Sequence, residues 1–514
     1  MSTPRHTETE RKFRVHGLFR LPSLAASEGA APLPGVADVR EGGTLDLLAV
    51  YYDTADLRLA RSRVSLRRRE GGPDEGWHLK LPTEGLETRE ELWCPLSAGA
   101  LPPEELTDVV RALTRGAALE EVAALRTTRV VHDLLDSEGA VLAELTDDSV
   151  SVLDGEHVAA RFREIEVELG TGEVELLDAV GEVLGVAGAV PGGYVSKVGR
   201  ALGPLATAPP DVAEPEPPGL DDPAGEVVRA HLARNVVALL AQDRRVRLDE
   251  PDSVHQMRVA ARRIRSGLKT FAPLVEEGWA VALREQLAWV AGVLGGVRDR
   301  EVLRERLLRH LAEVAESLPG LDTAPAAGLV DRTLADEAAA ARAGVLEVMR
   351  SPRYLDLLDR LVDAANVPRL TEAAQEPART ALPPLLGRAW RRLSRRVAIL
   401  AEADDDHHWH EARISAKQAR YAAEALAPVF GKPARRFAEQ LERVTELLGE
   451  HQDAAVAATT VRALASGRRV GGQVGFTLGL LHAAERRSIE DTRAEFRRVW
   501  PEVARRHHRA WLQP

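Results

Sequence analysis

The stretch EIEVEL at residues 164–169 alternates three glutamates with isoleucine, valine and leucine. Successive side chains of a β-strand point to opposite faces, so this stretch predicts a strand with one charged face and one apolar face. The apolar face needs cover, and the charged face needs either water or other charged groups. Because other predicted strands repeat the charged face, the sequence favours a sheet that closes around a polar lumen.

Several other predicted strands carry charges two positions apart, which places those charges on one face. Turn signals such as EGGPDEG (70–76) separate the strands, as in antiparallel β structure. Two predicted helices, near residues 102–124 and 173–186, would cover the apolar outer face. The alternative is a set of solvated strand faces with cross-strand ion pairs, but the recurrence of the pattern favours a shared lumen. The other charged sets are Glu8, Glu10 and Lys12; Arg67 and Arg69; His78 and Lys80; and Arg89 and Glu91.

A lumen of this kind suits phosphate chemistry. Carboxylates two residues apart offer the hard oxygen ligands that Mg²⁺ or Mn²⁺ prefers, and these ions keep some waters and bridge substrate phosphates. Facing arginines and lysines would neutralise phosphate charge, arginine through paired hydrogen bonds. Hydrolysis of a phosphoanhydride then requires positioning, charge neutralisation and an activated water.

The proline- and acid-rich stretch at residues 204–224 is typical of an extended linker. Up to residue 224 the chain carries 22 Lys and Arg against 40 Asp and Glu, whereas the remainder carries 46 against 39. This asymmetry predicts two domains with different tasks, and the cationic surplus of the second indicates an anionic partner. We therefore expect an α+β protein with a β domain at residues 1–203 and a helical domain at residues 225–514.

The helical part contains an internal repeat. The segment VHQMRVAARRIR (254–265) aligns with WHEARISAKQAR (409–420), and LGGVRD ending at Asp299 aligns with LGEHQD ending at Asp453. Agreement at both places, with nearly equal spacing between them, predicts two related helical bundles. Breaks near residues 317–327 and 376–384 would divide the region.

Each copy of the repeat carries a stripe of cations beside its apolar seam, at the helical spacing of three and four residues. Like charges at this spacing repel one another, so a bound anion would offset the cost. The alternative is a solvated face that pairs with acids such as Asp299 and Asp453. The stripes consist of His255, Arg258, Arg262, Arg265 and Lys269, and of His410, Arg413, Lys417 and Arg420, where Glu424 replaces the final cation.

Composition excludes several classes of protein. Cys94 is the only cysteine, which leaves no intramolecular disulfide or cysteine-rich zinc site. We expect no membrane association, since no apolar run approaches the length of a span and the N-terminus lacks a secretory signal. We also expect a cytoplasmic location. Nucleic-acid binding is disfavoured, because aromatic residues, which stack on bases, make up 4% of the chain.

The charged strands occur in an order that resembles the CYTH family, the triphosphate tunnel metalloenzymes. ETERKF (8–13) matches its ExExK signature, and YYDTADLRLARSRVSLRRRE, WHLKLP, TREE, AELTDD, REIEVEL and SKVGRAL follow in family order. The resemblance implies an eight-stranded antiparallel tunnel in which acids hold a divalent metal and basic residues hold a linear triphosphate. Family members include inorganic triphosphatases, thiamine triphosphatases and class IV adenylate cyclases.

Carried onto this chain, the resemblance assigns a role to each charged position. Glu8, Glu10 and Lys12 are the expected catalytic residues, with Lys12 orienting the attacking water or the terminal phosphate. Arg126 is a second candidate for the position given to Arg129. The expected metal ligands are Glu8, Glu10, Asp147, Glu164 and Glu166. The expected phosphate contacts are Lys12, Arg67, Arg69, Lys80, Arg89, Arg129 and Lys197.

The helical segments resemble the CHAD domain, over about residues 225–510. That resemblance implies paired four-helix bundles with a basic central surface that binds inorganic polyphosphate, and hence association with polyphosphate granules. His255 and His410 could alternatively hold a metal or orient a helix. Candidate contacts are the two cationic stripes together with Arg391, Arg392, Arg395 and Arg396.

The expected function is thus metal-dependent hydrolysis of a triphosphate, inorganic triphosphate first, with polyphosphate binding by the helical domain. Two alternatives stay open on the sequence. One is a non-enzymatic polyphosphate-binding adaptor with a vestigial tunnel, and the other is an adenylate cyclase of the class IV kind.

Overall fold

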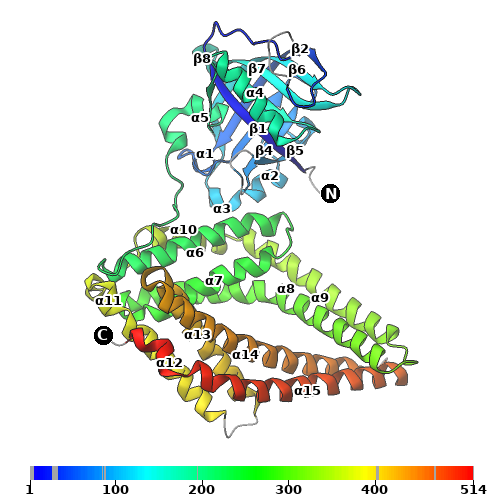
Figure 1. The fold of residues 1–514 in the computed structure, drawn as a ribbon, viewed down its shortest axis with the longest axis vertical. Helices are drawn as coiled ribbons and strands as arrows, with labels where there is room; N and C mark the ends of the chain where they lie inside the picture. The colour runs from blue at the N-terminus through cyan, green and yellow to red at the C-terminus, as the bar shows by residue number, and fades with distance from the viewer. Residues whose placement is uncertain are drawn as a thin grey trace. The chain divides into compact units, whose positions relative to one another are not determined.

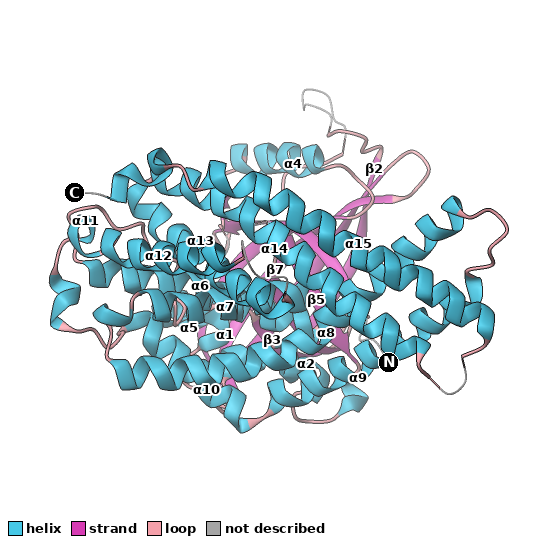
Figure 2. Ribbon diagram, turned by 90° about the horizontal axis from the view of Figure 1, so that it is seen from below, coloured by secondary structure: helices cyan, strands magenta, loops and turns pink. Residues whose placement is uncertain are grey.

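The computed structural model describes residues 5–25, 33–83, 85, 88–193, 195–400, 405–467 and 470–512. The chain divides into two compact units, Met1–Asp211 and Val212–Pro514. Among the described residues the strands lie in the first unit, and helices build the second (Figure 1, Figure 2). The predicted α+β class is confirmed.

The first unit is a closed antiparallel barrel. In the part of the chain that the structure describes, its strands follow the order β5-β4-β3-β2-β6-β7-β8-β1, and pairing of β1 with β5 closes the ring. A short strand, β9 (Val190–Pro191), adds to β1. The predicted eight-stranded tunnel is therefore confirmed. The barrel strands are β1 (Arg5–Val15), β2 (Asp38–Asp53), β3 (Ser65–Glu70), β4 (Gly76–Pro82), β5 (Thr88–Cys94), β6 (Glu120–Leu135), β7 (Val141–Asp154) and β8 (His157–Leu169).

The apolar side chains that alternate with the charged ones point out of the barrel. Ile165 and Val167 of β8 pack with Phe13 of β1 under helix α4 (Val174–Val186). This is the cover that the EIEVEL pattern requires, and the helix predicted near residues 173–186 is confirmed. Burial of this outer face leaves the glutamates of the same strand on the inner face.

The helix predicted at 102–124 was too long. The structure has α2 (Glu104–Val109) and α3 (Arg111–Thr114), and the chain then enters β6 at Glu120. Arg115 and Gly116 both adopt positive φ, which ends the helix as an αL cap. The segment that follows contains the β-branched residues Val122, Thr127, Thr128, Val130 and Val131, which favour a strand. Short helices α1 (Arg58–Arg61) and α5 (Lys197–Leu202) complete the principal helices of this unit.

The second unit consists of two halves related by the repeat. Helices α7, α8 and α9 correspond to α13, α14 and α15, and successive helices within each half pack against one another. Helix α10 packs on α6, α8 and α9 of the first half, where four helices were predicted. The halves comprise α6 (Ala224–Arg247), α7 (Ser253–Thr270), α8 (Glu277–Ser317), α9 (Ala324–Arg350) and α10 (Pro352–Asn366), then α11 (Ala378–Ala381), α12 (Pro383–Ile399), α13 (Asp406–Phe430), α14 (Lys432–Ala465) and α15 (Gly472–Val503).

The two halves meet at two places. Helix α7 lies against α13, and the long hairpins α8–α9 and α14–α15 meet farther along their length (Figure 1). An apolar cluster holds the hairpins together, with Leu307 and Val330 from one half and Val461 and Leu478 from the other. The cationic stripes therefore lie on helices that face each other.

Helix α8 is long and apolar enough, by length and composition, to cross a membrane. Here Leu283, Leu287, Val290 and Leu294 are buried, and the helix packs against α7, α9 and α10. It also carries Arg284, which lines the basic pocket described below. These features are those of a core helix in a bundle.

Candidate functional site

The barrel encloses a charged cavity of about 540 Å³. Its wall contains acids and bases from most strands of the barrel, together with the start of α5. The structure thus brings together side chains that the sequence placed on separate strands. The predicted site residues in this wall are Glu8, Glu10, Lys12, Arg67, Arg69, Lys80, Arg129, Glu166 and Lys197.

Glu166 lies at the centre of this arrangement. Its carboxylate is 2.9 Å from Lys12 Nζ, 2.5 Å from Lys197 Nζ and 3.5 Å from Arg129 Nη2. Burial alone would raise the pKa of Glu166, but the three cations outweigh burial and hold its pKa well below the usual value. The carboxylate is therefore ionised throughout the neutral range.

Lys197 enters the lumen from the first turn of α5. Ser196 caps this helix by accepting a hydrogen bond from the Gly199 backbone N–H at 3.1 Å, which fixes the direction of the lysine. Its ammonium also lies 3.0 Å from both Asp148 and Glu164. These carboxylates raise the pKa of Lys197 although burial acts to lower it. Glu164 is held further by Arg200 at 2.9 Å.

A second group of charges lies around β4 and β5. Lys80 pairs with Glu8 and lies 3.9 Å from Glu91, and His78 Nδ1 contacts Glu91 at 2.8 Å. Burial raises the pKa of Glu8 to about 8, whereas Lys80 and His78 oppose burial and hold the pKa of Glu91 low. The two carboxylates therefore differ in pKa, with Glu8 binding a proton more readily than Glu91.

A row of carboxylates crosses the lumen wall. Glu10, Glu168 and Glu144 occupy directly paired positions on β1, β8 and β7. Glu10 is 3.0 Å from Lys12, and this contact outweighs burial to lower its pKa. The pKa of Glu168 is raised by burial and by Glu10, and that of Glu144 by burial and by nearby acids. Such repulsion marks a place where a cation would be stabilising.

The donor set of this row fits a hard divalent cation. Among the described residues, no three His, Cys, Asp or Glu side chains converge as a ready cage. Mg²⁺ does not require one, because it usually keeps several waters and binds through one or two carboxylates plus substrate phosphates. Glu10 and Glu168 are the residues that would hold it, with Glu144 beside them.

One predicted metal ligand was placed on the wrong face. Asp147 points out of the barrel and forms a two-point ion pair with Arg163, at 2.8 and 2.6 Å. Side chains alternate along β7, so Glu144 and Asp148 share the inner face while Asp147 lies with Leu145 on the outer face. Asp148 is fully buried and accepts two hydrogen bonds of 2.8 Å from Arg129.

The remaining predicted phosphate contacts are less tightly paired. Arg67 lies 3.7 Å from Glu91, and Arg69 pairs with Asp74. Burial and the neighbouring Arg67 lower the pKa of Arg69 to about 9, so an anion here would relieve repulsion. Arg89 donates to the Arg63 carbonyl at 2.7 Å and lines an adjoining cavity together with Glu10 and Lys12.

Two further features define the lumen. Of the two arginines considered for one position, Arg129 faces inward and Arg126 is exposed.

An apolar cluster of Ala49, Tyr51, Leu125, Val150 and Val198 packs against α5 and continues the inner faces of the strands. The charged part of the lumen therefore ends at an apolar plug beside Lys197.

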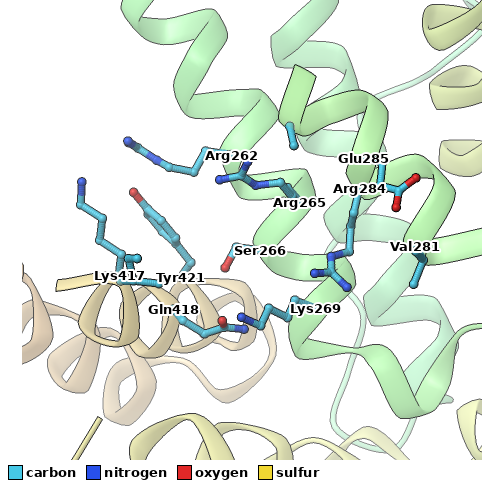
Figure 3. Close-up of a pocket in the computed structure, with 12 residues that line it drawn as sticks. Arg262, Arg265, Ser266, Lys269, Val281, Arg284, Glu285, Lys417, Gln418 and Tyr421 are labelled. Atoms are coloured by element: carbon cyan, nitrogen blue, oxygen red, sulfur yellow. The ribbon is translucent and has the colours of Figure 1, made fainter. Parts of the chain in front are cut away.

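The helical unit contains a basic pocket of about 430 Å³ between α7, α8 and α13. Side chains from α7 and α8 surround it on one side and those from α13 on the other (Figure 3). None of its cations has a carboxylate within ion-pair distance among the described residues. These cations are Arg262, Arg265, Lys269, Arg284 and Lys417.

Mutual repulsion is evident in this pocket. Burial and the neighbouring Arg413 and Arg262 lower the pKa of Lys417 to about 7. Burial and nearby cations also lower the pKa of Lys269. Arg262 lies over the ring of Tyr421, 5.3 Å from its centroid, so an aromatic face partly compensates one of the charges.

The outer members of the stripes have partners instead. Arg258 binds Asp299 at 2.6 Å, Arg413 lies 3.8 Å from Asp453, and Arg420 binds Glu424 at 2.7 Å. His410 contacts Gln452 at 2.7 Å, which orients its ring.

The other predicted cations lie around these partners. Burial lowers the pKa of His255. On α12, Arg396 binds Glu411 at 2.6 Å and Arg392 lies close enough to Lys269 to affect its pKa, while Arg391 and Arg395 are exposed.

Comparison with known proteins matches each of the two units to a domain family. The CYTH domain family matches residues 6–200, and the CHAD domain family matches residues 230–462. An uncharacterized protein of Mycobacterium tuberculosis H37Rv is 37% identical over 512 residues, covering 94% of this chain and 93% of its own.

Two solved structures are also similar. PptA from Streptomyces chartreusis is 29% identical with a TM-score of 0.48, covering 54% of this chain and 99% of PptA. The CHAD domain from the plant Ricinus communis is 24% identical with a TM-score of 0.43, covering 56% of this chain and 95% of that domain. The two matched domains follow one another along the chain, and the mycobacterial relative aligns across both of them. The chain belongs to the family of proteins in which a CYTH domain is followed by a CHAD domain.

Proposed function

We propose that the barrel hydrolyses a triphosphate, inorganic triphosphate in the first place, to pyrophosphate and phosphate with the help of Mg²⁺ or Mn²⁺. We further propose that the helical unit binds inorganic polyphosphate. The observation that carries the first proposal is the convergence of six cations and a row of acids in one cavity. The cations are Lys12, Arg67, Arg69, Lys80, Arg129 and Lys197.

In this proposal the cations bind and orient the phosphate chain. The ammonium groups of Lys12 and Lys197 lie 2.9 and 2.5 Å from the Glu166 carboxylate. Each ammonium has three N–H donors, so it could bind a phosphate oxygen and Glu166 at the same time. A divalent metal held by Glu10 and Glu168 would neutralise charge on the phosphates. Glu8, with a pKa of about 8 beside Lys80, is placed to hold and release a proton near neutral pH.

The lining of the cavity favours an inorganic substrate over a nucleotide. Most of the described lining residues are charged or polar, and Tyr51 is the one Phe, Tyr or Trp among them. Its ring belongs to the apolar plug. A base would therefore find little apolar surface on which to stack.

Phosphate release from tripolyphosphate, ATP and thiamine triphosphate tests the proposal, with EDTA, Mg²⁺ or Mn²⁺. We expect metal-dependent turnover, fastest with tripolyphosphate. Glu10→Gln removes one carboxylate of the row, and we expect the metal concentration for half-maximal rate to rise about 10–100-fold. Absence of metal-dependent turnover with every substrate would leave the adaptor alternative, and formation of cyclic AMP from ATP would indicate a cyclase.

Polyphosphate binding should depend on pH through Lys417. Its pKa is about 7 in the free protein, because it is buried and because Arg413 on its own helix and Arg262 and Arg258 on α7 face it, while Asp453 opposes these effects. A bound anion favours the charged form and raises this pKa, so the added affinity is present below pH 7 and is lost as pH rises. We expect binding up to about ten-fold weaker at pH 8 than at pH 6. The arginine in Lys417→Arg stays charged over this range, so the decrease in affinity between pH 6 and pH 8 should be much smaller in this variant. An unchanged decrease would show that another group causes the pH dependence.

A further inference from the structure

The repeat relates α8 to α14 residue by residue, just as it relates α7 to α13. Glu285-Gln286-Leu287 aligns with Glu439-Gln440-Leu441 at the spacing that also aligns Asp299 with Asp453. The aligned apolar positions of α8 and α14 are buried in both copies. Leu283, Leu287, Val290 and Leu294 are buried in the first copy, and Phe437, Leu441, Val444 and Leu448 are buried in the second.

This alignment gives the basic pocket a counterpart. A second pocket, of about 360 Å³, lies where α13 and α14 meet α6 and α7. Its four α14 positions, and two of its α13 positions, are equivalent to positions that line the basic pocket from α8 and α7. Ser266 corresponds to Tyr421, Glu285 to Glu439, and Arg284 to Ala438.

The two pockets differ in charge at these equivalent positions. The first has the cations Arg265, Lys269 and Arg284. At the equivalent positions of the second copy, Arg265 is matched by Arg420, which lies beside the second pocket, while Lys269 becomes Glu424, Arg284 becomes Ala438 and Ala288 becomes Glu442. Arg435 in place of Val281 restores one positive charge, and Arg234 of α6 and Arg263 of α7 line the opposite wall. At the repeat-equivalent positions, three cations are thus replaced by two cations and two additional glutamates.

The glutamates of the second copy also form ion pairs with Arg420, the equivalent of Arg265. Arg420 binds Glu424 at 2.7 Å, pairs with Glu442 and donates to Thr445 Oγ1 at 3.1 Å. Arg263 of α7 reaches Glu424 from the other side at 3.3 Å. The equivalent Arg265 has no such carboxylate partner among the described residues, and burial and nearby cations lower its pKa. An anion would have to break ion pairs to enter the second pocket, whereas it would relieve repulsion in the first.

We propose that the duplicated helical domain is a one-sided polyanion site, in which the α7–α8–α13 pocket binds polyphosphate and its repeat-related pocket does not. The inference rests on the proposed polyphosphate binding and specifies where it occurs. The repeat supplies two similar scaffolds, and Glu424, Ala438 and Glu442 distinguish the second from the first.

Exchanging the two charge patterns tests the proposal in the full-length protein. Fluorescence anisotropy with labelled long-chain polyphosphate in EDTA measures affinity without metal-dependent hydrolysis and keeps any tunnel contribution constant. Lys269→Glu with Arg284→Ala gives the first pocket the pattern of the second, and we expect about ten-fold weaker binding or more, since charge-assisted contacts are lost. Arg435→Ala in the second pocket should change the affinity less than about two-fold, because that pocket is not used.

The reciprocal change supplies a gain of function. Glu424→Lys, Ala438→Arg and Glu442→Ala, added to Lys269→Glu with Arg284→Ala, should recover most of the lost affinity. Arg332→Glu on the exposed face of α9 changes the net charge by −2, against −3 for Lys269→Glu with Arg284→Ala, and so controls for most of the change in net charge; thermal melts control for folding. Unchanged binding after Lys269→Glu with Arg284→Ala, or an equal loss after Arg435→Ala, would overturn the one-sided site. A wild-type protein that binds no polyphosphate would instead overturn the proposed function itself.

Discussion

Glu166→Gln is expected to lower kcat for tripolyphosphate about 10²–10³-fold, the size seen when a preorganised charged group is removed from an active site. The substitution keeps the shape of the side chain but removes the charge that holds Lys12, Lys197 and Arg129 in one cluster. The three cations remain and continue to attract the substrate. We therefore expect KM to change little, because a loss in kcat alone indicates an interaction made in the transition state.

A matched substitution separates this effect from a general loss of charge. Glu156 is exposed in the turn between β7 and β8, so Glu156→Gln should leave both kinetic constants unchanged. Steady-state kinetics at saturating Mg²⁺, with a thermal melt of each variant, make the comparison. If Glu166→Gln raised KM and left kcat intact, Glu166 would serve substrate binding only, and its central place in the proposed chemistry would be wrong.

Alternation in the sequence was sufficient to predict the lumen face of most strands. Glu164 and Glu166 face inward because Ile165 and Val167 need the cover of α4, and this constraint acts on every residue of the strand. The same rule, applied to β7 from Glu144, would have selected Asp148. Asp147 was chosen from the order of residues in a family motif instead of from the alternation of side chains along the strand. Within a strand, alternation is therefore the better guide to which residues face the lumen.

Contacts between segments far apart in the sequence were beyond prediction. The row of Glu10, Glu168 and Glu144 depends on the pairing register of three strands, which alternation within each strand does not fix. The apolar plug depends on where α5 docks after β8. In the helical unit the stripes were predicted, and Asp299 and Asp453 were named as possible partners, which the structure confirms for Arg258 and Arg413. The pairing of Arg420 with Glu442 depends on the packing of α13 on α14, which the sequence did not reveal.

A buried ion-pair network joins the two halves of the helical unit. Arg306 of α8 binds Glu485 of α15 at 2.8 Å, Glu450 of α14 at 2.6 Å and Ser488 at 3.1 Å. His310 Nδ1 lies 2.8 Å from the other oxygen of Glu485. Glu485 is 0% exposed and Arg306 is 4% exposed, so these charges depend on each other and not on water.

Arg306→Met should therefore destabilise the helical unit by about 3–5 kcal/mol, because it leaves the Glu485 carboxylate buried without its main counter-ion. Arg304→Met on the same helix is the matched control. Arg304 pairs with Asp331 where both side chains are about two-fifths exposed, at 42% and 41%, and such surface pairs contribute about 0–1 kcal/mol. Urea titrations give the free energy of unfolding, and hydrogen exchange in α8 and α15 assigns any loss to this network.

Replacing both partners distinguishes a buried charge from a lost contact. Arg306→Met combined with Glu485→Leu removes the uncompensated carboxylate, and apolar replacement of a whole buried pair is often close to neutral. We expect the double variant to recover at least half of the stability lost in Arg306→Met. A double variant as unstable as the single one would show that Arg306 acts through its contacts with Glu450 and Ser488. The junction between the halves would then depend on α14 rather than on the carboxylate of α15.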